Sequence, residues 1–277
     1  MPESAQQQVC YRHPDRPTRL SCSECGRPIC GACSIDASVG QRCPSCVRGG
    51  GTTRVVNGRA AASGLVAGLG PMTRVIMGVT IAVSVIQFLD PGAWYRLFDV
   101  LALGNAQTMA GDWWRLFTVV LLHAGFTHVL FNMWALYVLG PQIEREVGPL
   151  PYLSLYLATA AAGSALAVLL GSPRDVTVGA SGAIFGLFGV WLASAFRRRR
   201  TVAGRAILNQ LGVLLLINAA IPFLIPNVSW EGHFGGLVAG FGIGWVWTKL
   251  RGAEAAGLRI ATSTAVAVVS VFAVYLL

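Results

Sequence analysis

Several stretches of the chain are apolar over nearly the length of a membrane-spanning helix and carry no charge. Residues 180–196 are one example, and they contain no Asp, Glu, Lys or Arg. A helix needs about 20 mainly apolar residues to cross the hydrocarbon core of a bilayer. Charged residues make up only 12% of the chain, against about 25% in soluble domains, and the mean hydropathy is +0.60. The sequence therefore predicts an all-α fold, a polytopic bundle of membrane helices.

The apolar runs predict seven membrane helices. Residues 90–125, between the first two runs, are too long and too mixed in character for a simple turn. This segment contains Trp113 and Trp114, and tryptophan favours the headgroup zone of a bilayer. We therefore expect interfacial structure there. The predicted helices are residues 74–89, 126–141, 150–170, 180–196, 206–224, 233–249 and 259–277.

All seven cysteines lie before residue 47, in CxxC-like spacing. An odd number of cysteines in this spacing favours metal binding over a disulfide framework. With His13, the seven cysteines supply eight ligands. Eight ligands are enough for two tetrahedral zinc ions, which would supply most of the folding energy of so short a unit. The third and fourth ligand pairs could each join an earlier one. The four pairs are Cys10 with His13, Cys22 with Cys25, Cys30 with Cys33, and Cys43 with Cys46.

Charge and cysteine content predict the orientation of the chain. Metal-binding thiolates need a reducing compartment, which places the N-terminus in the cytoplasm. The net charge is +9, and the arginines lie beside apolar runs, as at residues 197–200, so they indicate membrane orientation rather than nucleic-acid binding. We expect no signal peptide, and a multi-pass protein of the cell membrane whose C-terminus lies outside.

The same features predict four parts along the chain. Residues 1–46 form a cytoplasmic zinc-binding domain. Residues 47–73 are rich in glycine and small residues and are expected to be a flexible linker. Residues 74–250 contain the first six membrane helices, and residues 251–277 add the seventh.

A few polar side chains begin the apolar runs. Ser181 and His233 each lie at the start of a predicted span, while His128 and Asn132 are four residues apart and share one helix face. With the N-terminus inside, the three helices that carry these residues all run from the outer to the inner side of the membrane. The groups at their starts therefore lie at the same depth in the bilayer. Taken singly, a serine or histidine in a membrane helix is more often structural. Together, a serine, a base and hydrogen-bond donors are the groups that acyl transfer requires.

Glycines follow the serine and the histidine at helical spacing. Gly236 and Gly240 follow His233, and Gly182 and Gly186 follow Ser181. Strips of small residues let two membrane helices approach closely. The acidic residues nearby, Glu231 and Asp175, are interpreted as loop acids that take no part in the site.

The membrane part resembles the rhomboid family of intramembrane serine proteases. The motifs that carry the resemblance are GASG at residues 179–182, HxxxxHxxxN at residues 123–132 and HxxGxxxG at residues 233–240. WR at residues 114–115 and QIEREVG at residues 142–148 also fit. The resemblance covers residues 74–250, the six-helix core of the family, so the seventh helix is an addition.

The resemblance implies a Ser-His dyad without a third acid. Ser181 would attack a peptide carbonyl, and His233 would accept its proton. His128, Asn132 and the backbone N–H of Ser181 would hold the oxyanion, and Phe185 could pack on the His233 ring. The substrates would be single-pass membrane proteins cleaved near the outer end of their span, with no cofactor for the chemistry.

The cysteine-rich segment resembles a B-box-type zinc finger. That resemblance implies interleaved ligands, with Cys10, His13, Cys30 and Cys33 on one zinc ion and Cys22, Cys25, Cys43 and Cys46 on the other. Such modules usually bind protein, so a cytosolic partner is expected and nucleic acid is not.

Two other classes of function are compatible with a bundle of membrane helices. A catalytically silent adaptor would bind transmembrane helices and recruit partners through its zinc finger, but the presence of both Ser181 and His233 favours the protease. A transporter or channel would show internal repeats and intramembrane charges along a path, and the sequence shows neither.

Overall fold

A computed structural model of the chain describes residues 8–36, 41–48, 68–224, 228–250 and 254–276. The chain forms two compact units, Met1–Ala62 and Ser63–Leu277. The division falls inside the predicted linker, most of which lies outside the described residues. The first helix of the second unit begins at Pro71 rather than at residue 74.

The first unit is built from very short elements around its cysteines. Strands β1 (Val9–Cys10) and β2 (His13–Pro17) form one antiparallel pair, and β3 (Ile35–Asp36) and β4 (Gln41–Arg42) form another. A 3-10 turn at Gly31–Cys33 and helix α1 (Pro44–Arg48) complete the described part. Its buried apolar cluster consists of Ile29 and five cysteines. A core this small cannot by itself stabilise a fold.

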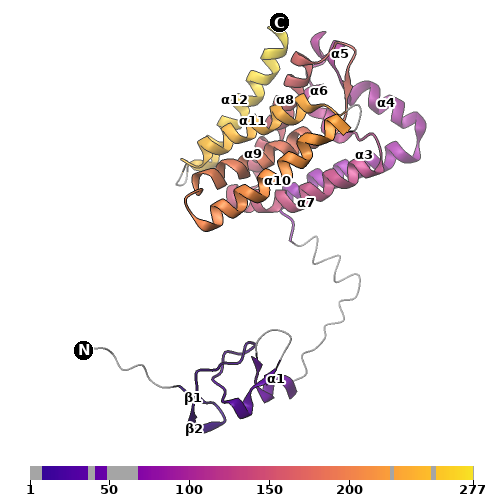
Figure 1. The fold of residues 1–277 in the computed structure, drawn as a ribbon. Helices are drawn as coiled ribbons and strands as arrows, with labels where there is room; N and C mark the ends of the chain where they lie inside the picture. The colour runs from indigo at the N-terminus through magenta and orange to yellow at the C-terminus, as the bar shows by residue number, and fades with distance from the viewer. Residues whose placement is uncertain (1–7, 37–40, 49–67, 225–227, 251–253, 277) are drawn as a thin grey trace. The chain divides into compact units, whose positions relative to one another are not determined.

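The second unit contains seven long helices among its described residues, one at each predicted apolar run (Figure 1). The predicted all-α bundle, with a small cysteine-rich N-terminal unit, is confirmed. Figure 1 shows α9, α10 and α11 running alongside one another. The helices are α3 (Pro71–Leu89), α7 (Phe126–Val147), α8 (Pro149–Leu170), α9 (Ser181–Arg197), α10 (Val202–Leu224), α11 (Trp230–Trp247) and α12 (Ala255–Tyr275).

Not all seven helices are long and apolar enough to cross a bilayer alone. Within the described residues α3, α8 and α12 qualify by length and composition, and a fourth span results if α7 is joined to the bent segment Arg115–Leu121 before it. Helix α9 has only 17 residues, about 25 Å of rise. Helix α9 is apolar, so it falls short of a full span by its length rather than by its composition.

The segment between α3 and α7 folds into short elements rather than a simple turn. Helices α4 (Pro91–Leu101), α5 (Asn105–Met109) and α6 (Arg115–Thr118) lie here, followed by a 3-10 turn at Val119–Leu121. Strand β5 (Leu103–Gly104) pairs antiparallel with β6 (Val176–Thr177). Because β6 lies just before α9, this pairing ties the segment to the loop that carries the GASG motif.

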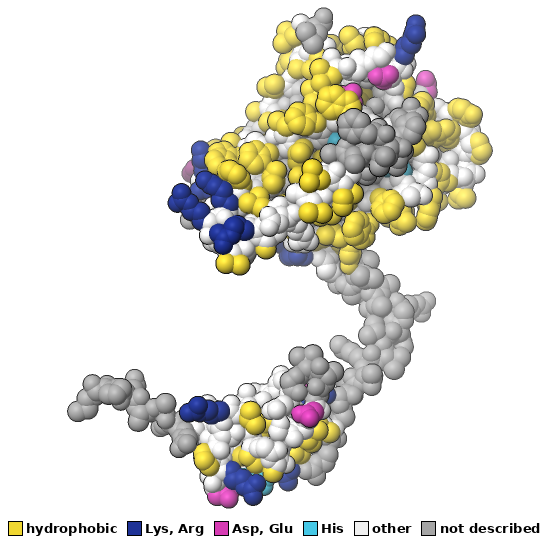
Figure 2. Space-filling view, in the orientation of Figure 1, with side chains coloured by type: hydrophobic (Ala, Val, Ile, Leu, Met, Phe, Trp, Pro, Cys, Tyr) yellow, Lys and Arg dark blue, Asp and Glu magenta, His cyan; other side chains and the backbone are white. Residues whose placement is uncertain are grey.

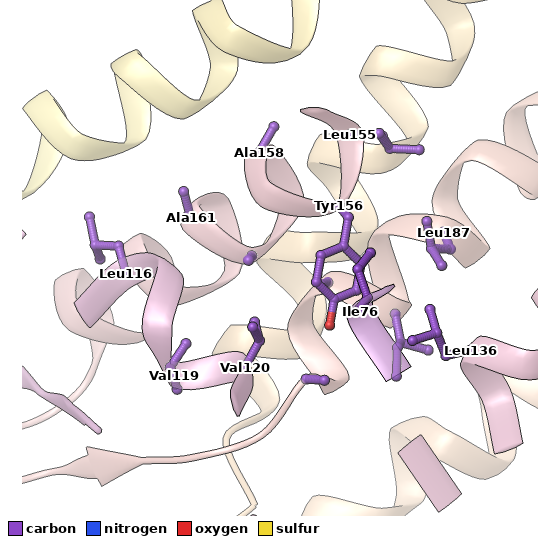
Figure 3. Packing of buried hydrophobic residues seen from close by; sticks show 14 of the residues in the cluster. Ile76, Leu116, Val119, Val120, Leu136, Leu155, Tyr156, Ala158, Ala161 and Leu187 are labelled. Atoms are coloured by element: carbon purple, nitrogen blue, oxygen red, sulfur yellow. The ribbon is translucent and has the colours of Figure 1, made fainter. Parts of the chain in front are cut away.

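Helix α8 supplies the centre of the membrane unit. Tyr152, Leu155 and Tyr156 are fully buried on it. In Figure 3, Tyr156 and its neighbours on α8 lie among apolar side chains from several other elements, including Val120 and Leu136. This packing holds α7 and α9 around one common helix.

Helices α9 and α11 pack backbone against backbone. A methyl group on Gly236 would collide with the carbonyl oxygen of Gly182, and one on Gly240 with that of Gly186. The strips of small residues therefore do bring the two helices together. The close approach fixes the positions of their first residues relative to each other.

The buried carboxylate of Glu144 caps the N-terminus of α3. It accepts hydrogen bonds from the backbone N–H of Met72 at 2.7 Å and of Thr73 at 2.9 Å, and from the Thr73 hydroxyl at 2.7 Å. These bonds satisfy N–H groups that lack partners inside the helix. This role for the QIEREVG motif was not predicted from the sequence.

Candidate active site

The helix contacts bring Ser181 and His233 together. Ser181 is the first residue of α9, and His233 lies in the first turn of α11. The Nε2 atom of His233 lies 2.8 Å from the Oγ atom of Ser181, across 52 positions of sequence. Both residues are partly exposed. A hydroxyl and an imidazole at this distance can exchange a proton.

The loop before Ser181 is held in an unusual backbone conformation. Gly179 has a φ of 130°, a region that residues with a side chain rarely adopt. Its N–H donates to the carbonyl oxygen of Val119 at 3.0 Å. A Cβ at this position would lie 2.7 Å from the imidazole of His128. Glycine is therefore required here by both conformation and space.

His233 is positioned by an aromatic ring. Phe185, one helical turn after Ser181, stacks on the imidazole with a centroid separation of 4.3 Å and an angle of 4° between the planes. The Nδ1 atom of His233 has no hydrogen-bond partner among the described residues. In this part of the chain the imidazole is thus oriented by stacking rather than by a carboxylate.

The two nearby acids are bonded elsewhere. Glu231 accepts a hydrogen bond from the Ser229 hydroxyl at 2.9 Å, and Asp175 accepts one from the Ser172 N–H at 2.7 Å. Glu231 lies in the first turn of α11, so its assignment to a loop was wrong. The helix starts earlier than residue 233 because Ser229 caps it, accepting from the N–H of Gly232 at 3.1 Å.

His128 lies on the other side of the same glycine. The position that a Cβ on Gly179 would take lies 2.8 Å from His128 Nε2 and 3.8 Å from Ser181 Oγ. The Nδ1 atom of His128 accepts from the N–H of Ala124 at 3.4 Å. An accepting Nδ1 leaves the proton on Nε2, so the donor nitrogen is the one beside Gly179.

Asn132 makes its hydrogen bond within its own helix. Its amide nitrogen donates to the backbone carbonyl of His128, one turn earlier on α7, at 2.9 Å. The side chain is buried on the helix face that it shares with His128, as the spacing predicted. An amide nitrogen carries two N–H donors, and this bond uses one of them.

The surroundings of His123 were not predicted. His123 is fully buried, and its ring packs edge-on against that of His128 with centroids 4.9 Å apart. The side chain of Gln87 donates to the His123 carbonyl and accepts from its N–H at 3.4 Å. A glutamine within the apolar run at residues 74–89 was the available sequence signal for this support.

The cysteine-rich unit gathers its ligands into two sets of four. Within each set, the candidate ligand atoms all lie within 4.8 Å of one another. The sets are the interleaved ones that the B-box resemblance implies. They are Cys10, His13, Cys30 and Cys33, and then Cys22, Cys25, Cys43 and Cys46.

The spacing of these atoms suits tetrahedral zinc. Zinc–sulfur bonds of about 2.3 Å place two sulfur ligands about 3.8 Å apart. The Sγ atoms of Cys22 and Cys46 are 3.9 Å apart, as are those of Cys25 and Cys43. His13 Nδ1 lies 3.4 Å from Cys30 Sγ. The donor set and its dimensions therefore fit zinc.

Local hydrogen bonds favour the thiolate form of two ligands. Burial raises the pKa of the Cys10 thiol, but hydrogen bonds from backbone groups of Arg12 and Cys30 outweigh it and lower that pKa to about 6. Burial also raises the pKa of the Cys22 thiol, but hydrogen bonds from backbone groups outweigh it and lower that pKa to about 6. Zinc binds thiolates rather than thiols.

Both units match known families. A family model described as the Rhomboid domain matches residues 110–250, about half of the chain. The match begins later than residue 74, where the motifs placed the start of the core. A second model, described as the B-box zinc finger, matches residues 5–38. Cys43 and Cys46 lie beyond that match.

Curated relatives agree with the first match. The chain is 39% identical to "Putative rhomboid protease YdcA" of Bacillus subtilis (strain 168) over 144 residues, 52% of this chain and 71% of that protein. It is 39% identical to "Rhomboid protease GluP" of the same organism over 137 residues, 50% of this chain but 26% of that protein. "RHOMBOID-like protein 5" of Arabidopsis thaliana is 36% identical over 147 residues, 52% of this chain and 47% of that protein.

Fold, site geometry and comparisons point to one assignment. The chain belongs to the rhomboid family and carries a B-box zinc finger at its N-terminus.

Proposed function

We propose that the protein is an intramembrane serine endopeptidase that uses Ser181 as nucleophile and His233 as general base. The observation that carries the proposal is the 2.8 Å separation of Ser181 Oγ and His233 Nε2. The names of relatives that include the word protease support the same reaction class.

The proposed reaction has two halves. Ser181 Oγ attacks the carbonyl carbon of a peptide bond while His233 Nε2 takes the hydroxyl proton. The carbon–nitrogen bond then breaks, and His233 gives the proton to the leaving amine. Water next attacks the ester on Ser181, again with His233 as base, and releases the carboxylate and the free serine. No metal or other cofactor takes part in this scheme.

Three donors would stabilise the oxyanion of each tetrahedral intermediate. They are the Nε2–H of His128, the side-chain amide of Asn132 and the backbone N–H of Ser181. The last is available because the first N–H groups of a helix have no partner within it. Each donor of this kind contributes on the order of 3 kcal/mol to the transition state.

The proposed substrates are single-pass membrane proteins. The site lies at the start of α9, and the short length of this helix supports a serine below the membrane surface. Cleavage would then fall near the outer end of the substrate's span. We further propose a cell-membrane location with the zinc finger in the cytoplasm and the C-terminus outside. The finger would hold two structural zinc ions and bind a cytosolic protein.

A labelled single-pass substrate and the purified full chain in detergent test the activity. Wild type should cleave it, Ser181→Ala should not, and Ser154→Ala, a matched change on α8, should keep the activity. A fluorophosphonate probe removes the dependence on substrate choice, because it should label wild type but neither Ser181→Ala nor His233→Ala. Equal labelling of all three would reject the dyad. A wild type that neither labels nor cleaves would favour the silent adaptor.

A further inference from the structure

A cavity lies at the opposite end of the helix bundle from Ser181. It has a volume of about 260 Å³, is partly open, and is lined by the ends of α7, α9 and α11 and by the beginnings of α10 and α12. Arg198, which lines it, directly follows the last residue of α9, whereas Ser181 is the first. The length of α9 separates the two ends by about 25 Å. The cavity is therefore distinct from the proposed active site.

Two buried nitrogen donors line this cavity without a partner among the described residues. Trp247 is only 4% exposed, and its Nε1 atom makes no hydrogen bond there. The Nε atom of Arg259 is buried and likewise has no partner. An unpaired buried donor costs about 1–3 kcal/mol. Both residues border the cavity, so a ligand with acceptor oxygens would recover this cost.

The charged groups of the cavity select an anion. Among the described residues that line it are Arg198, Arg259 and a single acid, Glu146. Arg198 and Glu146 are both exposed, and Arg198 also donates to the Ser194 hydroxyl at 2.9 Å. The guanidinium carbon of Arg259 lies 5.9 Å from the centre of the Trp247 ring, so the two residues are neighbours. Arginine guanidinium groups fit the oxygens of a phosphate group in shape and charge.

The remaining surroundings indicate that the anion comes from a lipid. Val190 and Ile207 add apolar surface to the cavity. Arginines also occupy residues 197–200, at the end of α9 and just before α10. Figure 2 shows Lys and Arg side chains gathered at one end of the helical unit, beside hydrophobic surface. Charged groups at a helix end lie at headgroup level.

We propose that this cavity binds the phosphate group of an anionic phospholipid, with its acyl chains along the neighbouring helix faces. Arg259 comes from α12, which lies outside the matched residues 110–250. The additional helix would thus supply one of the two cationic groups of the site. This proposal does not depend on the protease function.

Native mass spectrometry of the detergent-solubilised full chain tests the proposal, with phosphatidylglycerol and phosphatidylcholine as probes. Wild type should retain one phosphatidylglycerol in preference to phosphatidylcholine. Arg259→Gln should weaken retention about tenfold or more, the loss expected for one charged hydrogen bond. Arg197→Gln, the same change at a neighbouring arginine outside the cavity lining, should not. Trp247→Phe removes the N–H donor together with part of the ring and should also weaken retention, unlike Trp245→Phe.

Several results would overturn the proposal. Equal retention of phosphatidylcholine would show that charge is not recognised. Equal loss in Arg259→Gln and Arg197→Gln would place the lipid on the arginine-rich surface instead. Displacement of the lipid by inorganic phosphate at a similar concentration would make free phosphate the ligand. Unchanged melting temperatures of the variants would establish that they are folded.

Discussion

The ring of Phe185 lies parallel to the imidazole of His233, with centroids 4.3 Å apart. Ser181 and Phe185 are on the same helix, one turn apart, so a single helix presents both the hydroxyl and the surface on which the imidazole rests. His233 Nδ1 has no partner in the described part of the chain. The orientation of Nε2 toward Ser181 therefore depends on this stack.

Removal of the Phe185 ring should impair the proposed catalysis. Phe185→Ala is expected to lower kcat/KM about two- to tenfold, since aromatic stacking contributes about 0.5–1.5 kcal/mol. Phe196→Ala, near the other end of α9, serves as the matched control in the same cleavage assay. An unchanged rate for Phe185→Ala would mean that the imidazole is held by something else.

Asn132 should matter in the transition state more than in substrate binding. Asn132→Ala is expected to lower kcat about a hundredfold with little change in KM, because an oxyanion donor acts only where negative charge develops. Gln142→Ala is a close control, since Gln142 also donates to the carbonyl four residues earlier on α7, that of Val138. A raised KM with normal kcat would assign Asn132 to substrate binding instead.

The α9–α11 contact should tolerate no side chain at Gly240. Gly240→Ala places a methyl group against the Gly186 carbonyl and should reduce stability by about 1–3 kcal/mol. Gly242→Ala is the matched control on the same helix, where an added methyl group meets nothing within 4 Å. Thermal unfolding in detergent measures both. Similar melting temperatures for the two variants would contradict the close contact.

The Glu144 carboxylate should stabilise the start of α3. Glu144→Gln is expected to lower stability by about 2 kcal/mol, because it weakens charged hydrogen bonds to Met72 and Thr73. The exposed Glu146, two residues later, provides the control Glu146→Gln. The melting temperature in detergent should fall for the first variant alone.

Metal analysis can establish the pairing of the zinc ligands. Wild type should hold about two zinc ions per chain. Cys10→Ser combined with Cys30→Ser removes two ligands of one set and should leave about one zinc. Cys10→Ser combined with Cys22→Ser affects both sets and should leave none. The reverse result would mean that consecutive ligand pairs share a zinc ion.

Much of the architecture was predictable because lipid imposes simple rules on sequence. Long uncharged runs predicted the positions of seven helices, and CxxC-like spacing predicted the metal-binding unit. The predicted helix ends were less accurate where a side chain accepts hydrogen bonds from the first N–H groups of the helix. Pro71 begins α3 because Glu144, far along the chain, accepts its first N–H groups, and Ser229 starts α11 before His233.

The sequence by itself determined which residues could do chemistry: one serine, a few histidines and an asparagine at the starts of apolar runs. It also determined where close packing was possible, since glycine strips are visible in one dimension. Only the tertiary structure decided which of these groups meet. The 2.8 Å contact of Ser181 with His233, the stack of Phe185 and the cavity that joins Arg198 to Arg259 all depend on helix packing. Contacts between distant segments follow from the fit of whole helix faces, which local sequence does not specify.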